Sequence, residues 1–148
     1  MKKIGIHVCR GRFLESEVEQ IKLFDGKYTT GYKVVRFDIW SSDISSSSND
    51  CAAMLSTDDL GAMPSSGNMM DAANNEQIAW ASVQAGTAGF GPMESIIDPD
   101  NMVVQDLFIS GQHAGSSKDI NYLIVMEKYE FPNWHGAALM VKNKSQAI

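Results

Sequence analysis

Residues 32–40, Tyr-Lys-Val-Val-Arg-Phe-Asp-Ile-Trp, are the stretch of sequence that decides the fold class. Val35, Phe37 and Ile39 alternate with charged residues, and a period of two is typical of a strand with one buried face. A second long stretch, residues 120–130, has apolar residues on both faces, which predicts a central strand or one that a partner covers. Together the two stretches indicate a protein built from β-strands.

Shorter elements are predicted on either side of these two strands. Residues 20–24 alternate and are followed by Asp25-Gly26, a pair that favours a hairpin whose return strand begins near Tyr28. The remaining predictions are strands at 4–9, 51–57, 77–84 and 102–110, an arm or loop at 11–19, long loops at 58–76 and 85–93, a turn at 98–101 and a short helix within 134–143. The strand at 51–57 is expected to pair back to 32–40.

The whole pattern predicts an all-β protein, an antiparallel β-sandwich with a jelly-roll-like layout and a short C-terminal helix. An immunoglobulin-like sandwich is the alternative layout. The chain has 148 residues, near the commonest size of one domain, so a single sandwich domain over 1–148 is expected. Within it, residues 1–19 form an N-terminal arm in this interpretation, and residues 133–148 form a C-terminal segment.

Charge is divided unevenly along the chain. Residues 1–36 hold eight Lys or Arg and four acids, residues 37–117 hold eleven acids and no Lys or Arg, and residues 118–148 hold four bases and three acids. Two interpretations remain open: the acids lie on scattered loops, or the subunit is charge-polarised. In the second, its basic termini face an acidic partner or its acidic loops face a basic or metal-bridged one, and in a symmetric assembly opposite patches meet on neighbouring copies. No basic stripe with interleaved aromatic residues is present, so nucleic acid is not an expected partner.

The sequence has no apolar run long enough to span a bilayer, so a membrane is not an expected partner. The first residues lack the apolar stretch of a secretory signal, which predicts synthesis in the cytoplasm. Cys9 and Cys51 belong to no Cys-x-x-Cys pair and are interpreted as free thiols.

The residues that would carry catalysis or bind a metal are sparse. His7, His113 and His135 have no close spacing, and the chain contains neither a Gly-x-Ser-x-Gly elbow nor a phosphate-binding glycine loop. The acid pairs, Asp58 with Asp59 and Asp98 with Asp100, fall in predicted turns, where Asp commonly bonds the local backbone. The sequence therefore assigns no catalytic, cofactor-binding or metal-binding residue. The chain is not expected to be an enzyme or to need a cofactor, although Ca²⁺ at the second acid pair remains open.

Three tryptophans allow a second function. Trp40, Trp80 and Trp134 would stack on sugar rings if they were exposed on one face, which would make the chain a carbohydrate- or receptor-binding module. Packing in the core or in an interface is the alternative role for each ring.

The order of the segments resembles that of small uncharacterised proteins of marine tailed phages and other environmental viruses, which look like virion structural proteins. The resemblance is carried by Phe24-Asp25-Gly26-Lys27-Tyr28, Thr30-Gly31-Tyr32-Lys33, Gln77-Ile78-Ala79-Trp80-Ala81, Ile97-Asp98-Pro99-Asp100, the run Val103 to Ile109 and Asn121-Tyr122-Leu123-Ile124-Val125-Met126-Glu127. It implies a capsid coat, cement or decoration subunit. The expected partners are copies of the chain, as a homo-oligomer such as a trimer, and other virion proteins. The expected location is the virion, after synthesis in the host cytoplasm.

Overall fold

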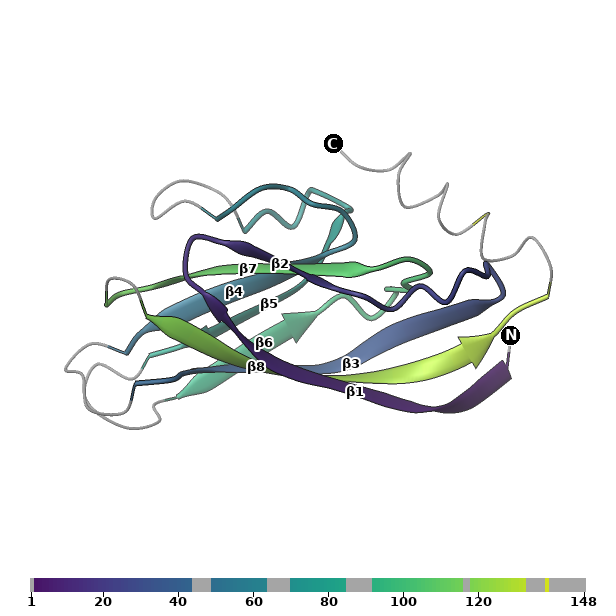
Figure 1. The fold of residues 1–148 in the computed structure, drawn as a ribbon, viewed down its shortest axis with the longest axis horizontal. Coiled ribbons are helices and arrows are strands. Elements are labelled where there is room, and N and C mark those ends of the chain that lie inside the picture. The colour runs from purple at the N-terminus through teal and green to yellow at the C-terminus, as the bar shows by residue number, and fades with distance from the viewer. Residues whose placement is uncertain are drawn as a thin grey trace.

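A computed structural model of the chain describes residues 2–43, 49–63, 70–84, 92–115, 118–132 and 138. These residues form eight strands in two antiparallel sheets that pack against each other (Figure 1). The predicted all-β sandwich is therefore confirmed. In the described part of the chain, no helix is both long and apolar enough to cross a membrane. Apart from Ala138, the predicted helix within 134–143 lies outside the described residues, as does nearly all of the C-terminal segment.

The first sheet has the order β1-β8-β3, and the second has the order β2-β7-β4-β5-β6. The strands of the first sheet are β1 (Lys2–Leu14), β8 (Asp119–Glu130) and β3 (Thr30–Ser41). Those of the second are β2 (Val18–Ile21), β7 (Leu107–His113), β4 (Cys51–Ser56), β5 (Gln77–Val83) and β6 (Met93–Ile97). The long strand predicted at 120–130 is central in its sheet, which is one of the two arrangements that its sequence allows.

The pairing of the strands is nested in the manner of a jelly roll, in which the first strand pairs with the last, the second with the seventh, the third with the sixth and the fourth with the fifth. β1 pairs with β8, β2 with β7 and β4 with β5. The third pairing is made just after β6, where the backbones of Tyr32 and Val103 exchange two hydrogen bonds of 2.8 Å. The buried side chain of Asn101 extends this contact, because its amide bonds both the N–H and the carbonyl of Val34.

The core lies between the two sheets. β8 turns Ile120, Tyr122, Ile124 and Met126 inward, and each of these side chains is buried. The largest fully buried side chains from the other strands include Phe37, Ile39, Leu55, Leu107 and Ile109. Both sheets therefore contribute one apolar face to a single core.

The prediction that Val35 lies on the inner face of β3 is wrong. The register with β8 shifts between Val34 and Arg36, which is a β-bulge. As a result Val34 is 1% exposed and points inward, whereas Val35 is 44% exposed. Phe37 and Ile39 are buried as predicted.

The hairpin predicted at Asp25-Gly26 is also wrong. Gly26 has the positive φ of 86° that such turns use, but β2 and β3 belong to different sheets. The connecting chain crosses between the sheets and is held by Asp106, whose carboxylate accepts hydrogen bonds of 2.8 and 2.9 Å from the N–H groups of Leu23 and Phe24. The Asp-Gly pair thus determines a local turn, but it does not determine which strands become neighbours.

Three other elements differ from their predictions. The predicted arm at 1–19 is largely β1 and β2, and β4 pairs with β5 and β7 instead of with β3. The strand predicted at 102–110 begins at Leu107 and continues to His113, because Val103 is used for the separate contact with β3. β6 was not predicted. The turn at 98–101 is confirmed by a 3.2 Å hydrogen bond from the Asn101 N–H to the Asp98 carbonyl.

Candidate functional site

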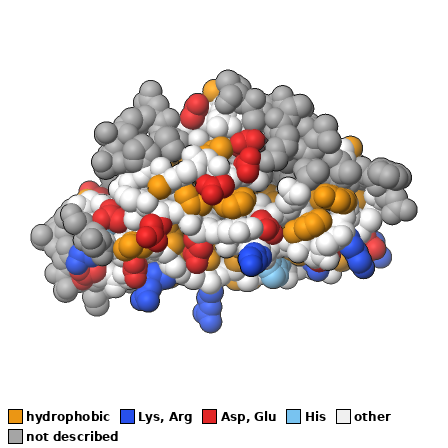
Figure 2. All heavy atoms as spheres, turned by 45° about the horizontal axis from the view of Figure 1, so that its top comes forward, with side chains coloured by type: hydrophobic (Ala, Val, Ile, Leu, Met, Phe, Trp, Pro, Cys, Tyr) orange, Lys and Arg blue, Asp and Glu red, His pale blue; other side chains and the backbone are white. Residues whose placement is uncertain are grey.

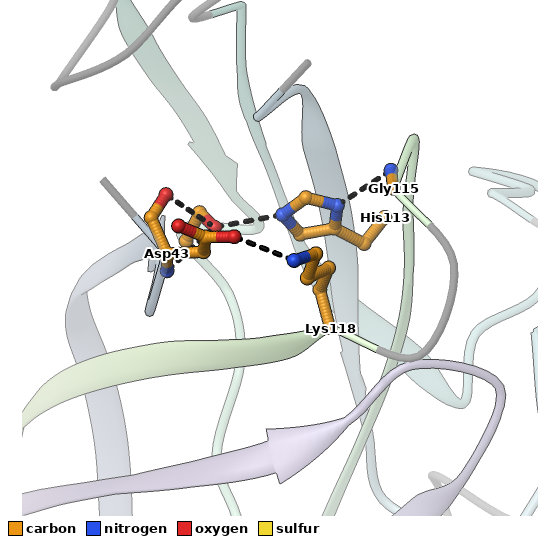
Figure 3. Close-up of polar contacts among 5 residues, drawn as sticks. Asp43, His113, Gly115 and Lys118 are labelled. Carbon is orange, nitrogen blue, oxygen red and sulfur yellow. Dashed lines mark hydrogen bonds and ion pairs between the residues drawn. The ribbon is translucent and has the colours of Figure 1, made fainter. Parts of the chain in front are cut away.

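A polar cluster centred on His113 joins the ends of β3, β7 and β8 (Figure 3). The His113 Nε2 atom lies 2.7 Å from the Ser41 hydroxyl, and the Gly115 N–H donates to His113 Nδ1 over 2.8 Å. Beside them, Lys118 Nζ lies 2.5 Å from Asp43 Oδ2. The cluster contains the residue types of a catalytic site, so the direction of each hydrogen bond decides what it can do.

The hydrogen bonds of His113 do not suit a Ser–His catalytic pair. Because Nδ1 accepts the Gly115 N–H, a neutral ring carries its proton on Nε2 and donates it to the Ser41 hydroxyl. A catalytic pair needs the reverse, with the imidazole accepting the proton of the hydroxyl. Burial lowers the pKa of His113, which favours this neutral ring. The cluster therefore connects strand ends and does not activate Ser41.

The acid pairs singled out in the sequence bond to their own turns. The carboxylate of Asp59 accepts the Gly61 N–H at 2.9 Å, and that of Asp98 accepts the Asp100 N–H at 3.0 Å. The described ranges contain no group of three or more His, Cys, Asp or Glu that could hold a metal ion. His7 lies on β1 with its ring centroid 5.5 Å from that of Tyr32.

Both cysteines are free thiols, as the sequence predicted. Cys51 is buried on β4, and burial, together with the nearby Asp50 carboxylate, raises its pKa to about 12. Burial also raises the pKa of Cys9. A thiol with a raised pKa is a poor nucleophile at neutral pH, so neither cysteine suits nucleophilic chemistry.

The outer face of the three-stranded sheet carries six apolar side chains among charged ones, and we call this set the outer strip. It consists of Ile6 and Val8 on β1, Leu123 and Val125 on β8, and Val35 and Trp40 on β3. Val8 lies directly opposite Val125 across the β1–β8 pair, and Val35 lies in the bulge beside it. Ile6 is 67% exposed and Val8 is 52% exposed. Charged residues lie between these side chains, because Glu127 is opposite Ile6, and Arg10 and Asp38 lie on either side of Leu123. The strip is therefore a mixed surface, in which exposed apolar groups are edged by charges.

At one end of the outer strip the surface is hollowed into an open groove. Its side chains include Arg10, Arg12, Trp40, Asn121 and Leu123. Strand pairing places Arg12, Asn121 and Trp40 in one row across the sheet. Arg12 lies 3.1 Å from the Asp119 carboxylate, whereas Arg10 forms no ion pair with any described residue. The groove thus combines an aromatic ring, an amide and cationic groups, as sites for anionic or sugar-like ligands do.

The two described tryptophans do not share a face. Trp40 lies in the outer strip, on the three-stranded sheet. Trp80 alternates with the core residues Ala79 and Ala81, so it lies on the outer face of the five-stranded sheet, where its Nε1 donates to Gln77 at 2.9 Å. Trp134 lies outside the described residues. A single platform built from Trp40 and Trp80 is therefore excluded.

Charge is separated in space as well as along the sequence. β1 contains Lys2, Lys3, Arg10 and Arg12 and no acid. Figure 2 shows acidic side chains spread over the face turned toward the viewer and most Lys and Arg gathered along its lower margin. Of the eleven acids in residues 37–117, all but Asp38 and Glu94 lie outside strands, as the scattered-loop interpretation predicts, and their separation from the cations also fits a charge-polarised subunit.

No protein-family model matches the sequence, and no curated protein matches it. Among solved structures, the chain is similar to a protein of Bacillus endospore appendages, which form a novel family of disulfide-linked pili. The similarity covers 89% of this chain and 92% of the other, with 7% identity and a TM-score of 0.37. A similarity of this strength carries no argument about function.

Proposed function

We propose that this chain is a structural subunit that acts by binding copies of itself, as a coat, cement or decoration subunit of a virion shell. The observation that carries the proposal is the outer strip. Ile6, Val8 and Val35 are each more than 40% exposed, at 67%, 52% and 44%. Covering them with another subunit would remove apolar surface from water, which is the main favourable term in association.

Two further observations support the same function. The nesting of β1 with β8, β2 with β7 and β4 with β5 is that of jelly rolls, although β6 pairs with β5 instead of β3. Viral capsid proteins use the jelly roll, as do lectins and cupins. The segregated charge would orient neighbouring copies and disfavour wrong contacts. The resemblance to phage virion proteins points in the same direction. An assembly subunit of this kind needs no active site, and the proposal accordingly gives the chain no catalytic role.

The proposal predicts self-association of the purified protein. Light scattering after size-exclusion chromatography, near neutral pH and moderate salt, is expected to give a mass above that of the 16.2 kDa chain and rising with concentration. Electron microscopy of the assembled fraction would then distinguish shells from filaments, and shells of uniform diameter are expected. A monomer at every concentration tested would rule out a self-assembling subunit.

The groove at the end of the outer strip favours a second candidate function, a module that binds acidic carbohydrates. Here Trp40 would stack on a sugar ring while Arg10 binds its carboxylate or sulfate. Calorimetric titration with sulfated oligosaccharides would show binding that Trp40→Ala and Arg10→Ala each weaken about tenfold or more, whereas Trp80→Phe leaves it unchanged. Absence of binding, or equal binding of neutral sugars by all variants, would remove this candidate.

A further inference from the structure

We infer that copies of this chain join head to tail, with the free edge of β1 in one copy pairing with the free edge of β6 in the next. The inference rests on the proposed function and deepens it, because it identifies the two surfaces through which the subunit would bind itself. The three-stranded sheet of one copy would thereby continue into the five-stranded sheet of its neighbour. The occupant of each edge is a second copy of the same chain.

Both strands lie at the edges of their sheets and are unusually exposed. β1 is hydrogen-bonded to β8 alone and β6 to β5 alone, while β3 of the other sheet lies near β6 without pairing with it. Within the described residues, neither free edge makes a regular backbone pairing. Six of the nine exposed large apolar side chains in the described ranges lie on these two strands. They are Ile4, Ile6, Val8 and Leu14 on β1, and Met93 and Ile96 on β6. An exposed apolar edge strand is a template for pairing with another chain.

The charges of the two edges are opposite. β1 carries four cations and no acid. β6 carries Glu94 and is followed by Asp98 and Asp100, in a region that has no Lys or Arg from residue 37 to residue 117. Cations on an edge strand normally discourage pairing, and here they would repel a second β1. They would attract an acidic edge, so the charge pattern selects β6 over β1 as the partner.

The outward residues of the two strands also match in spacing. Glu94 and Ile96 lie opposite Ser82 and Trp80 and so share the outer face of their sheet. Every pairing in both sheets is antiparallel. An antiparallel alignment that places Ile96 beside Val8 also places Glu94 beside Arg10, because each strand advances by two residues. Neither Arg10 nor Glu94 forms an ion pair within the described part of the chain.

The two edges lie on opposite sides of the sandwich, so the contact does not close after two copies. β1 packs near β2 at one end of the five-stranded sheet, whereas β6 lies at its other end, next to β3. A contact between two different surfaces continues to add copies until a ring closes or a filament grows. The mass in solution is therefore expected to exceed that of a dimer as concentration rises.

A charge-swap experiment tests the pairing. Arg10→Glu and Glu94→Arg are each expected to lower the association constant about tenfold, because each places like charges together at the joint. An equal mixture of the two variants is expected to regain association, because each joint between the two different variants has one Glu and one Arg. Ile96→Ser should weaken association about tenfold or more through loss of apolar contact. Lys27→Glu, a matched charge reversal at an exposed position away from both strands, should have no effect.

Association is measured by sedimentation velocity over a concentration series, and circular dichroism confirms that each variant melts like the unchanged protein. If the unchanged protein associates, and Arg10→Glu, Glu94→Arg and their mixture all associate equally, then β1 does not pair with β6. The proposed self-assembly is retained in that case. If Arg10→Glu weakens association but Glu94→Arg does not, and mixing restores nothing, β6 is not the partner. If the unchanged protein is monomeric throughout, both the edge pairing and the proposed function fail.

Discussion

Replacing Asn101 by Ala is expected to lower the free energy of unfolding by about 3 kcal/mol, because the side chain completes a strand pairing that the backbone leaves unfinished. Asn101 is 4% exposed. Its Oδ1 accepts the Val34 N–H at 2.9 Å, and its Nδ2 donates to the carbonyls of Val34 at 3.1 Å and Asp98 at 2.7 Å. Alanine would leave both polar groups of Val34 buried without these partners, and each such loss costs about 1–3 kcal/mol.

The measurement is urea unfolding of Asn101→Ala against the unchanged protein, at low protein concentration so that assembly does not contribute. Asn74→Ala is the control, since Asn74 is half-buried and its side chain accepts one 3.0 Å hydrogen bond from the Glu76 N–H in a turn. The control is expected to lose only about 1 kcal/mol. Equal losses in the two variants would mean that Asn101 acts as an ordinary turn residue and not as the link between β3 and the segment after β6.

The sequence predicted the fold class because alternation reports which face of a strand is buried. β8 is the clearest case, since apolar residues on both its faces correctly indicated a central strand. Alternation does not report which strand lies alongside. The strand predicted at 51–57 is expected to pair with residues 32–40, but β4 pairs with β5 and β7, and its inward residues are compatible with either arrangement. Neighbours in a jelly roll are distant in sequence, so local turn signals cannot identify them.

The candidate surfaces were harder to predict than the fold. The groove forms only because both β1 and β3 pair with β8, which brings Arg10 and Arg12 close to Trp40. No local sequence pattern predicts that these residues lie close together. β6 was missed because all of its residues but Ile97 are exposed, so it lacks the alternation that marks a half-buried strand. The uneven charge was visible in the sequence, yet its meaning depended on finding that β1 and β6 are both edge strands.

The second large effect is at Phe37 in β3, just after the bulge that separates Val34 from Val35. Phe37→Ala is expected to cost about 4 kcal/mol, because Phe37 is 0% exposed and its removal leaves a cavity between the sheets. A loss of this size is a large part of the stability of a typical domain, about 5–15 kcal/mol. Denaturation midpoints at fixed pH would measure this loss of stability. Val34→Ala and Val35→Ala are measured in the same way, as the pair that tests the position of the bulge.

The two valine variants test the register directly, since simple alternation from Phe37 would bury Val35 and expose Val34. The bulge instead leaves Val34 1% exposed and Val35 44% exposed. Val34→Ala is therefore expected to cost about 2 kcal/mol and Val35→Ala less than about 0.5 kcal/mol. The opposite order would mean that β3 runs without the bulge, and it would remove Val35 from the outer strip. The same bulge thus decides both the packing of the core and the apolar surface on which the proposed function depends.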